Sequence, residues 1–330
     1  MTAPEDQSTP LPNFIQAQNL TDECRQLLLS LPSEKGWWSP SIHLYQGFWH
    51  KTRFMDGVLS TQRNFKALDS DVLLITTPKS GTTWLKALLF ALLNRPSYSR
   101  SSNYPLFHKS PHEVVRSLEV DLYVDNPDPD LSSISSPRLF SSHLPFGSLP
   151  ESVVSSKCKL VYLCRNPKDT FVSLWHFMNQ VRLEDNLGAN PMEEAFEMFC
   201  RGVSAFGPFW DHVLGYYKAS LEMPNKVMFL KYEDMKERPV EELRRVAGFL
   251  GCPFSENQDE PVNEILRLCS FDRLSRLEVN QNGKLYNGVD KKFFFRKGEV
   301  GDWINNLSPE MAERLDRITE ERFSGLGLKF

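Results

Sequence analysis

The sequence predicts a single α/β domain, with a central parallel sheet flanked by helices and a loop built to bind phosphate. Three short apolar runs, at 72–76, 159–164 and 226–231, read as buried strands, and helical patterns follow each of them. Strands that alternate with helices favour one parallel sheet with helices on both faces. The 330 residues contain no internal repeat, low-complexity tract or linker that would separate two domains.

The first part of the chain supplies the first strand and helix. Residues 1–15 are polar and read as a disordered N-terminal tail, so that 16–330 form the domain. The run over 72–76 is apolar up to Thr76, and Pro96 is expected to end the helix that follows this strand. The expected elements here are an amphipathic helix over 24–31, an aromatic-rich segment over 37–54, a strand over 72–76 and a helix over 84–93.

The rest of the chain repeats the alternation. The stretch 121–137 is rich in Asp, Pro and Ser and reads as a loop. Pro167 suits the first position of a helix, and Gly251 suits the end of one. The expected elements are strands over 138–142, 159–164 and 226–231, a helix from Pro167 through Phe177, mostly helix over 192–217, and helices over 239–250 and 309–323.

Composition limits the classes of partner. Hydrophobic residues make up 41% of the chain and charged residues 24%, as in ordinary globular proteins. A net charge of −4 gives no overall field that would attract nucleic acid or an anionic membrane, so local basic residues would have to hold an anionic ligand. The six cysteines form no Cys-x-x-Cys pair and read as free thiols in a reducing compartment. The N-terminus has neither region of a secretory signal, and we expect a cytoplasmic protein.

The most informative segment joins the first strand to the next helix. Lys79, Ser80, Gly81, Thr82 and Thr83 form a tight turn there, and Trp84 follows. Helix-starting N–H groups, hydroxyls and a lysine together describe an anion-binding loop. The turn is not a Walker A loop, because its glycine comes after the lysine. A strand–turn–helix corner with an incidental lysine is the alternative reading.

Two further segments carry cations in suitable places. Arg165 follows the strand over 159–164, and Ser173 lies on the next helix, which would make a second anion site at a strand's carboxyl end. Arg296, Lys297 and Gly298 lie in a two-glycine loop that could close over phosphates. A surface arginine and a solvated charged loop are the alternatives.

His143 is the candidate general base. It follows a short strand and precedes a Leu-Pro turn, and imidazole titrates near neutral pH. A structural role is the stronger alternative for any lone histidine. The sequence has no His-Glu-x-x-His and no Cys/His cluster, so no metal is expected. Histidines without a comparable local context are His50, His108, His112, His176 and His212.

Taken in order, these motifs resemble the cytosolic sulfotransferase family over about residues 30–328. The matching segments are Pro78–Trp84, Ser142–Pro145, Arg165–Asp169, Tyr232–Asp234 and Arg296–Trp303. Each alone would be weak, whereas five in order are specific. The aromatic N-terminal region, with Glu-Lys-Gly-Trp at 34–37, looks like the plant branch of the family, which includes flavonol and steroid sulfotransferases.

The resemblance implies 3′-phosphoadenosine 5′-phosphosulfate (PAPS) as co-substrate and no metal. It implies in-line transfer of the sulfuryl group to an acceptor hydroxyl, with His143 as base and Lys79 stabilising the leaving phosphate. Trp84 and Phe271 would enclose the adenine, and Tyr232 would contact its edge. The implied cofactor-binding residues are Lys79, Ser80, Gly81, Thr82, Thr83, Trp84, Arg165, Ser173, Tyr232, Phe271, Arg296, Lys297 and Gly298.

Two positions depart from the family pattern. Many members carry a lysine two residues before the histidine, where this chain has Ser141. Animal members carry a Lys-x-x-x-Thr-Val-x-x-x-Glu dimer segment, of which only Glu313 is present here. We therefore expect a monomer, and an auxiliary charge that is either missing or supplied by another residue.

Two other functions compete with this reading. A phosphate-loop kinase or NTPase would need a Walker A lysine and a Mg²⁺-holding acidic strand end, and neither is present. A non-catalytic nucleotide-binding protein would have no need of His143. The acceptor stays open: a flavonoid or other phenol, a steroid hormone, a hydroxylated fatty-acid hormone or a desulfoglucosinolate with its oxime-type hydroxyl. The aromatic segment over 37–54 suggests a flat apolar pocket, although core packing explains it equally well.

Overall fold

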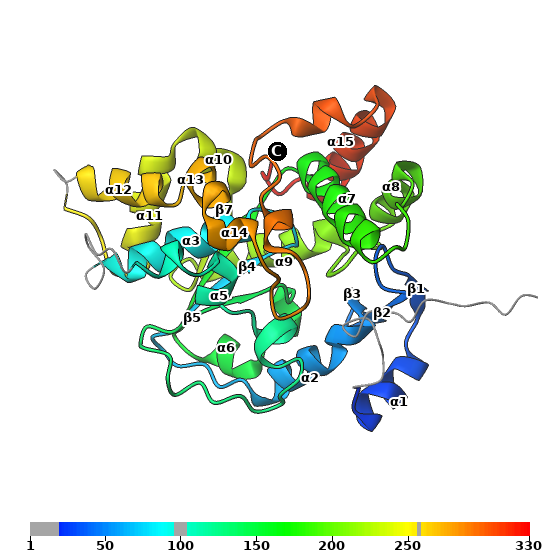
Figure 1. Ribbon diagram of the computed structural model, residues 1–330, viewed down its shortest axis with the longest axis horizontal. Helices are drawn as coiled ribbons and strands as arrows, with labels where there is room; N and C mark the ends of the chain where they lie inside the picture. Colours follow the sequence, from blue (N-terminus) through cyan, green and yellow to red (C-terminus); the bar gives the residue numbers. More distant parts are fainter. Residues whose placement is uncertain (1–19, 96–103, 256–258) are drawn as a thin grey trace, which may run out of the picture.

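A four-stranded parallel sheet forms the centre of the protein. The structure is a computed structural model that describes residues 20–95, 104–255 and 259–330. The strand order is β5-β4-β6-β7, and each neighbouring pair runs parallel (Figure 1). This arrangement confirms the predicted fold class. The strands are β4 (Val72–Thr76), β5 (Leu139–Ser142), β6 (Lys159–Cys164) and β7 (Val227–Lys231).

The described helices surround this sheet or extend from it. The α-helices are α1 (Asp22–Ser30), α2 (Met55–Asn64), α3 (Thr82–Leu93), α5 (Pro111–Val114), α6 (Glu151–Ser155), α7 (Pro167–Glu184), α8 (Met192–Cys200), α9 (Phe209–Glu222), α10 (Tyr232–Glu237), α11 (Pro239–Phe249), α12 (Glu260–Leu268), α13 (Phe271–Arg276), α14 (Glu278–Gln281) and α15 (Pro309–Phe323). Shorter turns of other helix types are η2 (Thr52–Phe54), η3 (Pro105–Phe107), η4 (Leu118–Leu122), η5 (Phe146–Ser148), η6 (Lys291–Phe294) and η7 (Asp302–Asn305).

Both faces of the sheet are buried. Along β6, Leu160, Tyr162 and Cys164 point into one hydrophobic cluster, which contains residues of α7, α8 and α9. Val161 and Leu163 point the other way, into a cluster built with α3, α11 and α12. Alternate side chains of a strand face opposite sides, so an all-apolar strand needs a helix layer on each side. This explains why the strand runs lack polar alternation.

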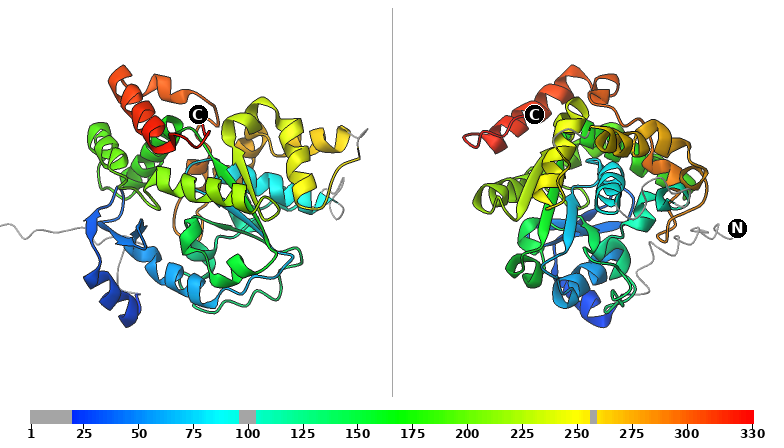
Figure 2. Two further views of the ribbon diagram at one scale, coloured as in Figure 1. Left: turned by 180° about the vertical axis from the view of Figure 1, so that it is seen from behind. Right: turned by 90° about the vertical axis from the view of Figure 1, so that its left-hand side faces the viewer.

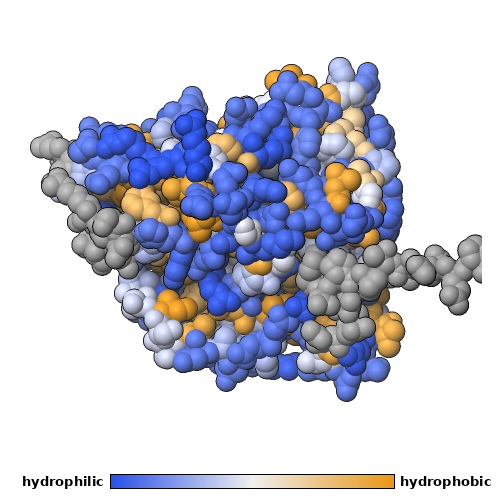
Figure 3. All heavy atoms as spheres, in the orientation of Figure 1, coloured by the Kyte–Doolittle hydropathy of each residue, from blue (hydrophilic) through white to orange (hydrophobic). Residues whose placement is uncertain are grey.

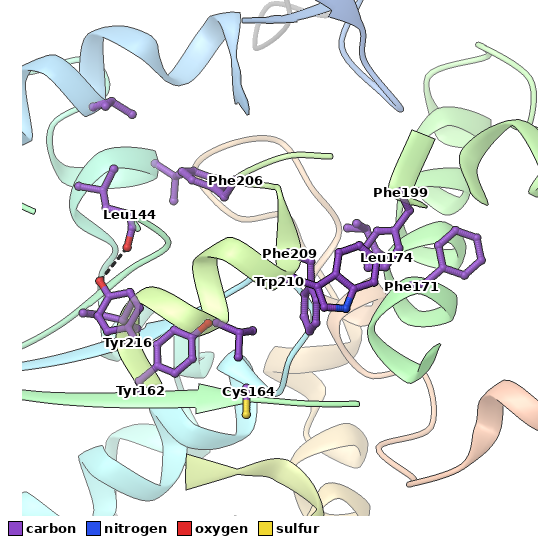
Figure 4. Packing of buried hydrophobic residues seen from close by; sticks show 14 of the residues in the cluster. Leu144, Tyr162, Cys164, Phe171, Leu174, Phe199, Phe206, Phe209, Trp210 and Tyr216 are labelled. Atoms are coloured by element: carbon purple, nitrogen blue, oxygen red, sulfur yellow. Dashed lines mark hydrogen bonds between the residues drawn. The ribbon is translucent and has the colours of Figure 1, made fainter. Parts of the chain in front are cut away.

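The first of these clusters is rich in aromatic rings (Figure 4). Tyr162 stacks on Tyr216 of α9 with ring centroids 4.3 Å apart. The Tyr216 hydroxyl donates to the carbonyl of Leu144 at 2.8 Å, which satisfies a buried polar group. The contact also fixes the chain just after β5, where His143 lies.

A second, antiparallel sheet of three strands lies near the N-terminal end of the described chain. Its strands are β1 (Ser33–Lys35), β2 (Ser41–Tyr45) and β3 (Phe48–Lys51). It lies with α1 at the opposite end of the molecule from α12 (Figures 1 and 2). The sequence analysis expected only an aromatic-rich segment here. The missed signal is the Gln46-Gly47 turn, where both residues have positive φ, as a tight hairpin requires.

Most expected elements are confirmed, and a few boundaries are wrong. α7 runs to Glu184 rather than Phe177, because residues 178–184 contain no helix breaker. The stretch 192–217 holds two helices, α8 and α9, separated by residues 201–208. α3 begins at Thr82, two residues earlier than expected. The expected tail over 1–15 and the stop at Pro96 lie outside the described residues.

Surface and cysteine properties agree with the composition. All six cysteines are free thiols, as expected. Hydrophilic side chains cover most of the face in Figure 3, and hydrophobic ones appear there in separate small groups. Within the described ranges, no helix is both long enough and apolar enough to cross a membrane.

A buried ion pair ties the start of β4 to the start of β5. Asp71 accepts hydrogen bonds from Nε and Nη2 of Arg138 at 2.8 and 2.6 Å, and from the N–H of Leu68 at 2.8 Å. The Asp71 side chain is fully buried, and that of Arg138 is 11% exposed. The paired geometry satisfies both charges away from water.

We predict that Asp71→Ala lowers the free energy of unfolding by about 3–5 kcal/mol, because it leaves the Arg138 guanidinium buried without a counter-charge. Urea denaturation measures this change. The matched control is Glu194→Ala, which removes the exposed partner of Lys35 and should cost less than about 1 kcal/mol. Equal effects of the two substitutions would contradict the prediction.

Candidate active site

A cavity of about 380 Å³ lies where the four parallel strands end. Each strand is followed by a residue that lines it: the loop after β4 supplies Lys79, and β5, β6 and β7 are followed by His143, Arg165 and Tyr232. Of the residues predicted from the sequence, Ser80 alone does not line this cavity. Those that do are Lys79, Gly81, Thr82, Thr83, Trp84, His143, Arg165, Ser173, Tyr232, Phe271, Arg296, Lys297 and Gly298.

The loop after β4 has a backbone suited to an anion. Lys79 has φ +70° and Gly81 has φ +108°, a region that L residues rarely adopt. A Cβ atom at Gly81 would lie 2.8 Å from the ring of Tyr232, so glycine is required there. As a glycine, Gly81 cannot cap α3 with a side chain, and the first N–H groups of that helix remain available. The Ser80 hydroxyl is buried against Thr77 instead, 2.5 Å away.

Three cations face the same part of the cavity. The Lys79 ammonium lies 4.1 Å from the ring centroid of Phe177. Burial lowers the pKa of Lys79 to about 7, and the charges of Arg296 and Arg165 lower it further in the same direction. Among the described residues no carboxylate pairs with Lys79. The arrangement therefore fits a ligand with several negative charges.

Arg165 and Arg296 are held by main-chain and acidic groups. Arg165 donates to the carbonyl of Glu299 at 2.5 Å, and Arg296 donates to Asp302 at 2.5 Å. In the described part of the chain, the Nε groups of both arginines are buried without a hydrogen-bond partner. Two orphaned donors beside one cavity fit a bound anion.

Lys297 and Arg296 share one acidic partner. Both donate to Asp302, whose side chain is fully buried. Burial alone would raise the pKa of Asp302, but the hydrogen bonds from Lys297 and Arg296 hold it well below its ordinary value. Asp302 belongs to the Arg296–Trp303 segment named above, and its structural role was not predicted.

Aromatic residues line the cavity next to these cations, and the Arg165 guanidinium lies 4.7 Å from the ring centroid of Tyr232. The rings of Trp84 and Tyr232 meet edge to face at 5.5 Å. The Tyr232 hydroxyl donates to the carbonyl of Gly298 at 2.8 Å. Gly298 has φ +69°, and a Cβ atom there would lie 2.5 Å from Phe271. Trp84, Tyr232 and Phe271 thus bound a space suited to a planar ring.

His143 is fixed in one tautomer. Its Nδ1 lies 2.7 Å from the carbonyl oxygen of Thr76, and a carbonyl can only accept, so Nδ1 carries the proton and Nε2 keeps a lone pair. Its main-chain N–H donates to Glu119 at 2.7 Å. Burial lowers the pKa of His143 to about 3, and its hydrogen bond to Thr76 offsets only part of this effect. The imidazole is neutral at physiological pH and can accept a proton.

A second lysine lies beside the position where family members carry one. The Ser141 and Ser117 hydroxyls are 2.7 Å apart, and Nζ of Lys86 lies 3.3 Å from Ser117. Lys86 also lies 3.3 Å from Nδ1 of His112, whose Nε2 is 2.9 Å from the Thr83 hydroxyl. Sequence reasoning set His112 aside and missed Lys86. The available signal was that Thr83 and Lys86 share one face of a helix.

Residues of the aromatic-rich segment over 37–54 also line the cavity. Trp38 and Phe54 line it, together with Lys51, Phe206 and Tyr286. The sequence pattern had suggested an apolar pocket made by this segment, and Trp38 and Phe54 are consistent with that. Lys51 was not singled out. Within the described ranges, no cluster of three or more His, Cys, Asp or Glu residues could hold a metal ion.

The parallel sheet, the loop at a helix start and the convergent cations define an α/β enzyme with a site for an anionic nucleotide. A model of the sulfotransferase domain matches residues 69–327, and the chain belongs to this family of enzymes. It is 52% identical over 325 residues to Cytosolic sulfotransferase 12 of Arabidopsis thaliana, covering 98% of each chain. The predicted cytoplasmic location agrees with the name of that relative.

Solved structures lead to the same family. A crystal structure of an Arabidopsis thaliana sulfotransferase has a TM-score of 0.77 and 46% identity, covering 97% of this chain and all of the other. The mouse sulfotransferase SULT7A1 was solved with PAP, which is PAPS without its sulfuryl group. It has a TM-score of 0.67 and 27% identity, covering 86% of this chain and 95% of the other. The mouse member of the family therefore binds this nucleotide.

The buried histidines predict how stability depends on pH. Burial lowers the pKa of His50 and His212 to about 4 and that of His143 to about 3. In the unfolded chain histidine titrates near 6.5, so the unfolded state binds more protons below that pH. The stability contributed by these neutral histidines is complete above pH 6.5 and is lost as the pH falls toward 4.

We therefore predict that unfolding near pH 5 takes up about three protons from these histidines alone. The slope of unfolding free energy against pH measures this uptake. His212→Gln should reduce the slope by about one proton, once its own loss of stability is subtracted. A free energy that is flat between pH 6.5 and 4.5 would contradict the prediction.

Proposed function

We propose that the protein transfers the sulfuryl group of PAPS to a hydroxyl group of a small plant metabolite, with His143 as the general base. The observation that carries the proposal is the placement of a neutral, oriented imidazole in the same cavity as Lys79, Arg165 and Arg296. A base beside three cations, of which Lys79 has no carboxylate partner among the described residues, suits transfer between an anionic donor and a hydroxyl acceptor.

The residues present fit PAPS at both of its charged ends. Lys79 and the first N–H groups of α3 would hold the 5′-phosphosulfate. Arg165, Ser173 and the loop from Arg296 to Gly298 would hold the 3′-phosphate, and the unpartnered Nε groups of the two arginines favour this. Trp84, Tyr232 and Phe271 would enclose the adenine. Ser80 would contribute its main chain alone.

Bound PAPS supplies a sulfuryl group that can leave a phosphate oxygen for an acceptor oxygen. Nε2 of His143 would take the proton of the acceptor hydroxyl as its oxygen bonds to sulfur. Lys79 would stabilise the charge that grows on the departing phosphate oxygen.

Lys86 would add a positive charge from behind Ser117 and His112, in place of the lysine that many relatives carry at the position of Ser141. We also propose that the protein is a monomer and that it binds one small hydroxylated acceptor.

We predict that His143→Ala lowers kcat by about 10²–10⁴-fold while leaving nucleotide affinity unchanged, because the imidazole acts on the acceptor proton. Transfer of labelled sulfate from PAPS to a panel of hydroxylated plant metabolites measures turnover, and titration calorimetry with PAP measures binding. Near-normal turnover by the variant on an accepted metabolite would rule out His143 as base.

We also predict that PAP binding at pH 7.5 takes up protons. The pKa of Lys79 is about 7 in the free protein, so much of it is neutral there, and a phosphate beside it raises that pKa. Calorimetry in buffers of different ionisation enthalpy should give an uptake of roughly half a proton or more. The part of this uptake that comes from Lys79 should disappear in Lys79→Met. Equal uptake by both proteins would place the phosphate away from Lys79.

A further inference from the structure

Another buried lysine, Lys51, lines the cavity. Lys51 is the last residue of β3 and is only 8% exposed. Its ammonium lies 4.3 Å from the ring centroid of Trp38 and 5.7 Å from that of Phe54. All three residues line the same cavity as His143. Aromatic faces attract a cation but do not neutralise it.

Lys51 lacks the counter-charge that Arg53 and Arg296 have. Among the described residues, its ammonium makes no ion pair and no hydrogen bond to a side chain. Arg53, two residues on, pairs with Asp125 at 2.8 Å, and Arg296 pairs with Asp302. Burial lowers the pKa of Lys51 to about 7, and no carboxylate acts against this effect. A buried amine of this kind is stabilised by an anion from outside the chain.

Lys51 lies where the main cavity joins a smaller one of about 170 Å³. Trp38, Lys51 and Phe54 line both cavities, and so do Val120, Tyr286 and Asn287. The residues predicted to hold PAPS do not line the smaller cavity. The anion that would pair with Lys51 therefore belongs to the acceptor and not to the nucleotide.

On this basis, and resting on the proposed function, we propose that the acceptor is a hydroxylated carboxylic acid whose carboxylate pairs with the Lys51 ammonium while its hydroxyl faces His143. The apolar skeleton of the acid would lie against Trp38 and Phe54. Since a charged hydrogen bond in a desolvated site discriminates strongly against an uncharged analogue, the preference should be large. Among the acceptors left open by the sequence, a hydroxylated fatty acid meets this requirement and a neutral steroid does not.

The test compares matched acceptors that differ in this one group. Hydroxylated fatty acids and hydroxybenzoic acids are assayed with PAPS beside their methyl esters. We expect kcat/KM to be about ten- to a hundred-fold higher for the best acid than for its ester. Lys51→Met should remove this preference by lowering kcat/KM for the acid and sparing that for the ester. Lys35→Met, on the same small sheet but exposed and paired with Glu194, should behave as the wild type.

Binding of the acid to the PAP-loaded protein, followed by calorimetry, should weaken by the same factor in Lys51→Met, while PAP binding alone stays unchanged. An ester turned over as well as its acid, or a Lys51→Met variant that slows both equally, would overturn the inference and leave the proposed function intact. If no acceptor is sulfated and PAP does not bind, the proposed function itself fails.

Discussion

The site depends on the parallel register of four strands. β4 pairs with β5 and β6, and β6 pairs with β7, so that Ile75 lies opposite Ser142 and Cys164 lies opposite Lys231. All four carboxyl ends therefore meet at one edge of the sheet, where ligands of open α/β sheets bind. The order of the strands brings residues 79, 143, 165 and 232 into one cavity, although they are far apart in the sequence. A slip of register or a reversed strand would separate base from cations.

Buried positive charge is the second constraint. Lys51 and Lys79 line the cavity and Lys86 lies behind its wall, against Ser117 and His112. Burial lowers the pKa of each lysine to about 7. Without a ligand, the folded chain must tolerate the unfavourable free energy of these buried lysines. The large apolar clusters on both faces of the sheet offset it. Anionic ligands relieve the same excess of positive charge, so their binding stabilises the folded state as well as filling the site.

The sequence was sufficient to predict the positions of the four parallel strands and of most helices, and to identify the residues that follow those strands. Short, mostly apolar runs are distinctive, and each was followed by a motif with its own chemistry, such as Arg165 or the Lys79 loop. Lys51, Lys86 and His112 could not be found in this way. Tertiary packing brings Lys51 and His112 to the cavity and Lys86 behind it, and a lone lysine on a short strand reads as a solvated residue. The loop also turns the Ser80 hydroxyl toward Thr77, a contact that the sequence did not predict.

The clamping of His143 has a consequence for regiochemistry. Its ring is held by the carbonyl of Thr76 and its main chain by the carboxylate of Glu119, which also accepts the Ser142 hydroxyl. With both ends fixed, the point at which a proton can be removed is stationary relative to the sheet. For an acceptor anchored at its far end, the distance from that anchor to Nε2 of His143 would then be fixed. Along a chain with several hydroxyls, the one at the matching span would be sulfated and its neighbours left free.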